Sequence, residues 1–118
     1  MIKPCLHPLV VTLCGSTRFK KEYQEWNRRL TLEGHVVLSV AWFAHADGPE
    51  PTVEQKELLD RIHLRKIDLS QAIFVFDVEG YIGQSTRREI DYAYGHGKLV
   101  RYLSEILEAE ESGFAEAW

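Results

Sequence analysis

The chain has little of what marks secreted, membrane-spanning and disulfide-bonded proteins. It holds two cysteines, Cys5 and Cys14, in 118 residues, too few for a disulfide framework. No apolar run approaches the roughly 18 residues that a membrane-spanning helix needs, and residues 1–11 lack the apolar segment and cleavage site of a signal peptide. We therefore expect a cytoplasmic protein with reduced thiols that does not act at a membrane.

A surplus of basic residues is also missing. The 14 Lys and Arg are outnumbered by 18 Asp and Glu, giving a net charge of −4, whereas a nucleic-acid-binding domain needs a basic face. The five histidines and two cysteines form neither an HExxH nor a CxxC motif. The glycines of a dinucleotide fingerprint and the lysine of a P-loop are absent too. We expect no nucleic acid polymer as partner, no metal and no cofactor.

What is present is an alternation of strand and helix patterns. Short apolar runs rich in β-branched residues predict strands, and apolar faces at helical spacing predict helices. The strands are expected at 9–14, 36–41, 72–77 and 99–103, and the helices at 18–33, 52–69, 86–95 and 104–112. Such alternation is typical of a parallel sheet with helices on both faces. We predict one α/β domain over residues 1–118, a small flavodoxin-like or Rossmann-like three-layer sandwich with four to five strands, mainly parallel.

Two details of this pattern lead to further expectations. Thr52 and Gln55 have the spacing of a capping box, so a helix should start there, and its inward-facing residues should be Leu58, Leu59, Ile62 and Leu69. A sheet of four strands leaves long edges to cover. We therefore expect a homodimer or a larger homo-oligomer.

The loop after the first predicted strand is a candidate binding loop made of Gly15, Ser16, Thr17 and Arg18. A glycine there lets the backbone turn tightly and approach a ligand, and the start of the next helix offers free N–H groups to an anion. The two hydroxyls and Arg18 add donors and charge. The alternative is an ordinary strand-to-helix turn in which Ser16 or Thr17 caps the helix.

The most informative stretch is residues 72–98, which join a buried strand to a glycine-containing loop and a helix. Glu89 lies on the same face of that helix as Ile90 and Ala93, close to the sheet edge where open α/β folds bind ligands. A carboxylate held there is a candidate nucleophile. The alternative is structural, because Thr86 and Glu89 also have the spacing of a capping box.

Three segments resemble the nucleoside 2-deoxyribosyltransferase-like superfamily. They are LCGSTRF (13–19), HLRKIDL (63–69) and GQSTRREIDYAYGHGK (83–98), in the order and spacing of that superfamily. The resemblance covers about residues 10–103 and implies that Glu89 is the catalytic nucleophile. It would attack C1′ of a 2′-deoxyribosyl group and displace the base, and another base or water would then resolve the covalent glycosyl-enzyme.

The resemblance also implies the substrate-binding residues. The loop of residues 15–18 would line the site, and Ser85 and Thr86 would face the sugar or its 5′ substituent. Two positions depart from the superfamily, which carries an aspartate at the position of Gly83 and a glycine at that of Ser85. His63, within the second segment, is expected at a helix terminus, and a role at the site is the alternative.

The departure at Gly83 leaves open which group protonates the leaving base. Asp47, Asp68 and Asp77 are the candidates, and the last two would then lie at the substrate. The expected partner is a small nucleoside or nucleoside monophosphate, and both transfer and hydrolysis are open. The rival interpretation is a non-catalytic nucleotide-binding or sensing module with the same pocket.

Overall fold

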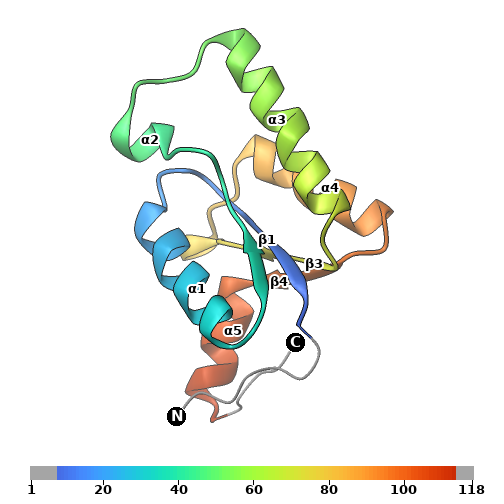
Figure 1. The fold of residues 1–118 in the computed structure, drawn as a ribbon. Coiled ribbons are helices and arrows are strands. Elements are labelled where there is room, and N and C mark those ends of the chain that lie inside the picture. The colour runs from blue at the N-terminus through green and yellow to red at the C-terminus, as the bar shows by residue number, and fades with distance from the viewer. Residues whose placement is uncertain (1–7, 114–118) are drawn as a thin grey trace.

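The computed structural model describes residues 8–113, which form a four-stranded, all-parallel sheet covered by helices on both faces (Figure 1). The strands are β1 (Val10–Cys14), β2 (Val36–Leu38), β3 (Ala72–Val75) and β4 (Leu99–Tyr102), in the order β2-β1-β3-β4. β1 is central, with Thr12 paired to Leu38 on one side and to Ile73 on the other. The predicted small flavodoxin-like or Rossmann-like α/β sandwich is confirmed.

Five α-helices and one short 3-10 turn connect the strands within the described residues. They are α1 (Lys20–Leu32), α2 (Ala44–Asp47), α3 (Val53–Asp68), the turn η1 (Val78–Gly80), α4 (Gln84–Gly95) and α5 (Leu103–Glu111). α1 and α5 cover one face of the sheet, and α3 and α4 cover the other (Figure 1). None of these helices is long and apolar enough to cross a membrane. Homo-oligomerisation stays a prediction.

The alternation of side chains along the strands divides the core into two parts. On β1, Val11 and Leu13 pack toward α1 and α5, whereas Cys14 packs toward α3 and α4, because successive residues of a strand point to opposite faces. Cys14 is a free, fully buried thiol, and Cys5 lies outside the described residues. β1 therefore ends with a thiol on the α3/α4 face, at the edge of the sheet where ligands bind in this fold class.

Helix α3 differs from its prediction in the face that it buries. The capping box of Thr52 and Gln55 is confirmed, but the expected inward face is wrong, because Leu58, Ile62 and Leu69 are exposed. The helix buries His63 and Ile67 instead. A helix of 16 residues is about 24 Å long at 1.5 Å per residue, longer than the strands beneath it, and its first half extends beyond the sheet (Figure 1). That half is not packed against the sheet, so Leu58 is exposed and Leu59 is half-buried at the cavity wall. In the second half the helix turns the face of His63 and Ile67 inward, which leaves Ile62 and the C-cap Leu69 exposed.

Several other boundaries shift. The second strand ends at Leu38 rather than at residue 41, and the third at Val75 rather than at residue 77. Residues 42–51, where neither a strand nor a helix is predicted, contain the single-turn helix α2. Helix α4 begins at Gln84, two residues before its predicted start, with Gly83 as N-cap. Thr86 is consequently buried inside the first turn, and the Arg87 N–H already donates to the Gly83 carbonyl. The capping-box interpretation of Thr86 and Glu89 is therefore wrong, and Glu89 does not serve as a cap.

Candidate functional site

A cavity of about 450 Å³ opens at the carboxyl ends of β1 and β3. Its walls come from the loop after β1, from residues 40–51, from α3 and from the start of α4. It brings together eight of the ten residues that the sequence suggested for the site: Gly15, Ser16, Thr17, Arg18, Gly83, Ser85, Thr86 and Glu89. Its volume lies within the range of small-molecule sites, which is about 300–1,000 Å³.

The two remaining candidates, Asp68 and Asp77, do not line this cavity. Asp68 ends α3 and accepts a hydrogen bond from the Tyr92 hydroxyl, the main reason why its pKa lies below its ordinary value. Asp77 accepts from the backbone N–H of Ser104 at 2.9 Å and from its hydroxyl at 2.6 Å. Both carboxylates hold neighbouring elements together. Asp47, the third candidate proton donor, pairs with Lys20 at 2.8 Å.

The binding loop is held in one conformation by its surroundings. Gly15 has a φ of +150°, and a Cβ added there would lie 3.0 Å from the Cβ of Phe76. A side chain at this position would therefore collide with Phe76, the residue that follows β3. The Tyr23 hydroxyl donates to the Gly15 carbonyl at 2.8 Å. The N-cap of α1 is Phe19, without a side-chain cap. The alternative in which Ser16 or Thr17 caps the helix is therefore wrong.

The hydroxyls of this loop contact other side chains at the cavity wall. The Arg18 Nε donates to the Ser16 Oγ at 3.0 Å, and the Thr17 Oγ1 lies 2.7 Å from the His45 Nδ1. The Arg18 guanidinium also stacks over the Tyr81 ring, 4.5 Å from its centroid. Arg18 from this loop and Tyr81 from the segment before α4 thus place a cation and an aromatic ring at the cavity, a pair suited to an oxygen-rich, flat ligand.

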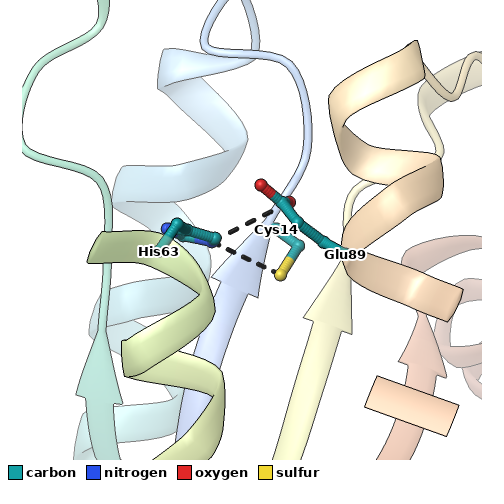
Figure 2. A group of neighbouring side chains, drawn as sticks. All are labelled: Cys14, His63 and Glu89. Atoms are coloured by element: carbon teal, nitrogen blue, oxygen red, sulfur yellow. Dashed lines mark hydrogen bonds and ion pairs between the residues drawn. The ribbon is translucent and has the colours of Figure 1, made fainter. Parts of the chain in front are cut away.

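Glu89 lines the cavity and lies beside two residues that come from other elements. Figure 2 shows Cys14 at the tip of β1, His63 on α3 and Glu89 on α4, with their side chains pointing toward one another. The His63 Nε2 lies 3.5 Å from the Cys14 Sγ and 3.9 Å from the Glu89 Oε1. The Glu89 side chain is 13% exposed and the His63 side chain 9%. His63 is thus part of the site, contrary to the expected helix-terminus role.

Burial moves the pKa values of these two groups in opposite directions. It raises the pKa of Glu89 from 4.5 to about 7, with the nearby Asp60 charge adding to the effect and Cys14, Lys56 and Arg88 opposing it. Burial lowers the pKa of His63 from 6.5 to about 4. The pair is therefore uncharged over part of the acidic range, and Glu89 changes its charge near neutral pH. A carboxylate with such a pKa is typical of functional sites.

A second group of polar side chains at the cavity, separate from the Cys14–His63–Glu89 contacts, joins α3 to the start of α4. The Lys56 Nζ lies 3.0 Å from the Asp60 Oδ1 and 3.0 Å from the Ser85 Oγ. The Arg88 guanidinium reaches the same Ser85 hydroxyl at 3.3 Å. Two carboxylates besides Glu89, those of Glu50 and Asp60, line the cavity. Glu50 and Asp60 are thus placed to act as acids on a molecule bound in the cavity, whereas Asp68 and Asp77 lie outside its lining.

Sequence reasoning missed Cys14 and Asp60 as members of the site and assigned His63 elsewhere. Cys14 had a usable signal, because it is the last residue of its strand on the face opposite to Leu13. His63 had one as well, since it lies four residues before the buried Ile67 on the same face of α3. No family model, curated protein or solved structure matches the chain. What the site does is therefore argued from its own geometry.

Proposed function

We propose that the protein cleaves or transfers the N-glycosidic bond of a nucleoside or deoxynucleoside, or of its 5′-monophosphate, through a covalent glycosyl-Glu89 intermediate. The observation that carries this proposal is the position of Glu89. Its carboxylate forms part of the wall of the cavity, is largely buried, and is released from any helix-capping role because α4 starts at Gln84. The resemblance of residues 13–19 and 83–98 to the nucleoside 2-deoxyribosyltransferase-like superfamily supports the same reaction.

The proposed reaction has two steps. A carboxylate oxygen of Glu89 attacks C1′ of the sugar, the C1′–N bond breaks, and its electron pair leaves with the base, which takes up a proton from an acid. The glycosyl ester on Glu89 is then attacked at C1′ by water or by a second base, whose proton returns to the conjugate base of that acid, and Glu89 is released as a carboxylate. Both steps pass through oxocarbenium-like transition states, as in retaining glycosidases.

The other walls supply groups that suit such a substrate. Trp42 and Tyr81 line the cavity and offer ring faces on which a base can stack. Arg18 and Lys56 also line it and can bind the sugar's 5′ oxygen or a 5′-phosphate. For the proton that the leaving base needs, Asp60 and Glu50 replace the three aspartates considered from the sequence, because they are the other carboxylates at the cavity.

The test is release of free base. The purified protein is incubated with a panel of deoxynucleosides, ribonucleosides and their 5′-monophosphates, each with and without a second base, and products are separated by chromatography. We expect base release for at least one substrate and its loss by at least a factor of about 10³ in Glu89→Gln, since the amide is no nucleophile. The matched control is Asp91→Asn, an exposed acid on the same helix, which should retain the rate.

Two results would contradict the proposal. Base release that survives in Glu89→Gln would exclude the covalent intermediate on this residue. Binding of a nucleotide by calorimetry without release of base from any member of the panel would instead favour the rival interpretation, a nucleotide-binding or sensing module. A glycosyl adduct of the expected mass on the peptide that contains Glu89, trapped by acid quench, would establish the first step directly.

A further inference from the structure

The three side chains that meet behind the cavity are all of types that bind metal ions. Cys14, His63 and Glu89 come from β1, α3 and α4 and converge on one point (Figure 2). The Sγ, the Nε2 and a carboxylate oxygen all lie within 4.8 Å of one another. The closest pair, the Sγ and the Nε2, is 3.5 Å apart, and the Nε2 is 3.9 Å from the Glu89 Oε1.

These separations are close to those within a zinc site. Zinc binds thiolate, imidazole and carboxylate ligands at about 2.0–2.3 Å with tetrahedral geometry, so its ligand atoms lie about 3.3–3.6 Å from one another. The Sγ–Nε2 distance already falls in that range. The Glu89 oxygen, 3.9 Å from the Nε2 and within 4.8 Å of the Sγ, needs to move by up to about 1 Å toward the other two ligand atoms to reach these separations.

We propose that Cys14, His63 and Glu89 form a three-ligand binding site for Zn²⁺ or a similar divalent transition metal, with the fourth coordination position open to the cavity. The ligand set selects the metal, because thiolate and imidazole favour zinc-class ions over Mg²⁺ and Ca²⁺, which prefer oxygen. His63 and Glu89 both line the cavity, which gives the ion its path to the fully buried thiol.

The surroundings of His63 favour ligation as well. Its side chain is only 9% exposed, so the imidazole ring is enclosed by the protein with its Nε2 beside the Cys14 thiol. All three ligands sit on regular elements, Cys14 at the end of β1, His63 within the 16-residue helix α3 and Glu89 within α4. Their positions are therefore set by the fold, and binding needs little reorganisation.

Occupation of this site would have one consequence for activity, which rests on the proposed function. A metal ion coordinated by the Glu89 carboxylate withdraws electron density from its oxygens, so the carboxylate becomes a poorer nucleophile toward C1′. Zinc should therefore inhibit base release, and a chelator should restore it. This predicts a protein whose nucleophile is available only when the metal site is empty.

Metal binding itself is tested with Co²⁺ as a spectroscopic probe, on the full chain in the presence of a non-thiol reductant. A cobalt–thiolate bond gives an intense charge-transfer absorption, which should appear with one equivalent of Co²⁺ and disappear on addition of Zn²⁺. We expect Cys14→Ser to abolish the band, and His63→Gln and Glu89→Gln to weaken Co²⁺ binding at least tenfold. Cys5→Ser is the matched control and should leave the band unchanged.

The proposal is overturned if the folded wild-type protein shows no thiolate band, or if the band follows Cys5 rather than Cys14. Circular dichroism establishes that each variant is folded. Should Cys14→Ser not fold, calorimetric titration of Glu89→Gln with Zn²⁺ decides, since an unchanged affinity there refutes the site. A cobalt band without any base release would leave the metal site established and the proposed reaction refuted, so the two failures are distinguishable.

Discussion

Replacing one member of the His63–Glu89 pair should reveal a pH dependence of stability that the intact pair conceals. The two groups are buried in one site with the His63 Nε2 3.9 Å from the Glu89 Oε1. Burial raises the pKa of Glu89 to about 7 and lowers the pKa of His63 to about 4. A pKa that differs between the folded and unfolded states makes the free energy of unfolding depend on pH.

The signs of the two contributions are opposite. The folded-state pKa of Glu89 is raised, so its contribution is present below the unfolded value of 4.5 and is lost as pH rises through about 7. The folded-state pKa of His63 is depressed, so its contribution is present above the unfolded value of 6.5 and is lost as pH falls through about 4. Each pKa shift changes the free energy of unfolding by about 3 kcal/mol, at about 1.36 kcal/mol per pKa unit. Between about pH 4.5 and about pH 6.5 the Glu89 contribution falls with pH while the His63 contribution rises, so the two cancel in the wild type.

Urea unfolding of the metal-free protein at several pH values from about 4 to about 8 measures this, with each variant compared with the wild type. The free energy of unfolding of Glu89→Gln, relative to the wild type, should rise by about 3 kcal/mol between about pH 4.5 and about pH 7. The free energy of unfolding of His63→Gln, relative to the wild type, should fall by about 3 kcal/mol between about pH 4 and about pH 6.5. The exposed control Asp91→Asn should differ from the wild type by a constant.

Differences that stay constant with pH, within about 0.5 kcal/mol, would refute the reasoning for the variant concerned. A slope of the wrong sign in Glu89→Gln would mean that the carboxylate is stabilised rather than destabilised by its site. A direct titration of the Glu89 carboxyl by NMR would then give a folded-state pKa below 4.5 instead of about 7.

Three further outcomes follow from the same structure. If Glu89 must be ionised to attack, with its pKa near 7, the rate of base release should rise about tenfold from about pH 6 to about pH 8, and a flat profile would contradict this. Gly15→Val should lower the free energy of unfolding by about 1–3 kcal/mol and weaken substrate binding, because a Cβ there lies 3.0 Å from that of Phe76; calorimetry and urea unfolding measure both. Asp77→Ala should cost about 1–3 kcal/mol through its lost bonds to Ser104 and leave base release within about twofold, whereas a collapse of the rate in folded protein would return Asp77 to the site.

The alternating pattern was sufficient to predict the fold and the edge of the sheet at which the cavity lies. Four apolar runs and the helices between them admit few topologies, because parallel connections are right-handed and short. The same rule brought Gly15 and Glu89 together, since both follow strands that end at one edge. The fold and the edge of the sheet that carries the cavity can thus be predicted from the periodicity of apolar residues, which is a local property of the sequence.

The face of an element was harder to predict than its place. The predicted inward face of α3 assumed that the whole helix lies on the sheet, whereas its first half extends beyond it, and Leu58 is exposed while His63 is buried. The sequence predicts Asp77 as the last residue of the third strand, but β3 ends at Val75 and the Asp77 carboxylate accepts hydrogen bonds from Ser104 at the start of α5. The end of a strand determines at which edge of the sheet the next residue lies. It does not determine whether that side chain points into the cavity, because this depends on the contacts that the following residues make. Those contacts are tertiary and cannot be derived from sequence spacing.

The thiol of Cys14 separates the two uses proposed for Glu89. As a nucleophile Glu89 needs no sulfur, and a serine in place of Cys14 keeps a hydroxyl that can donate to the carboxylate. As a metal ligand Glu89 depends on that sulfur, because the Sγ–Nε2 pair at 3.5 Å is the part of the site that is already spaced for zinc. Cys14→Ser should therefore retain base release and make it insensitive to zinc. A variant that loses base release while folded and metal-free would show instead that the thiol takes part in the reaction.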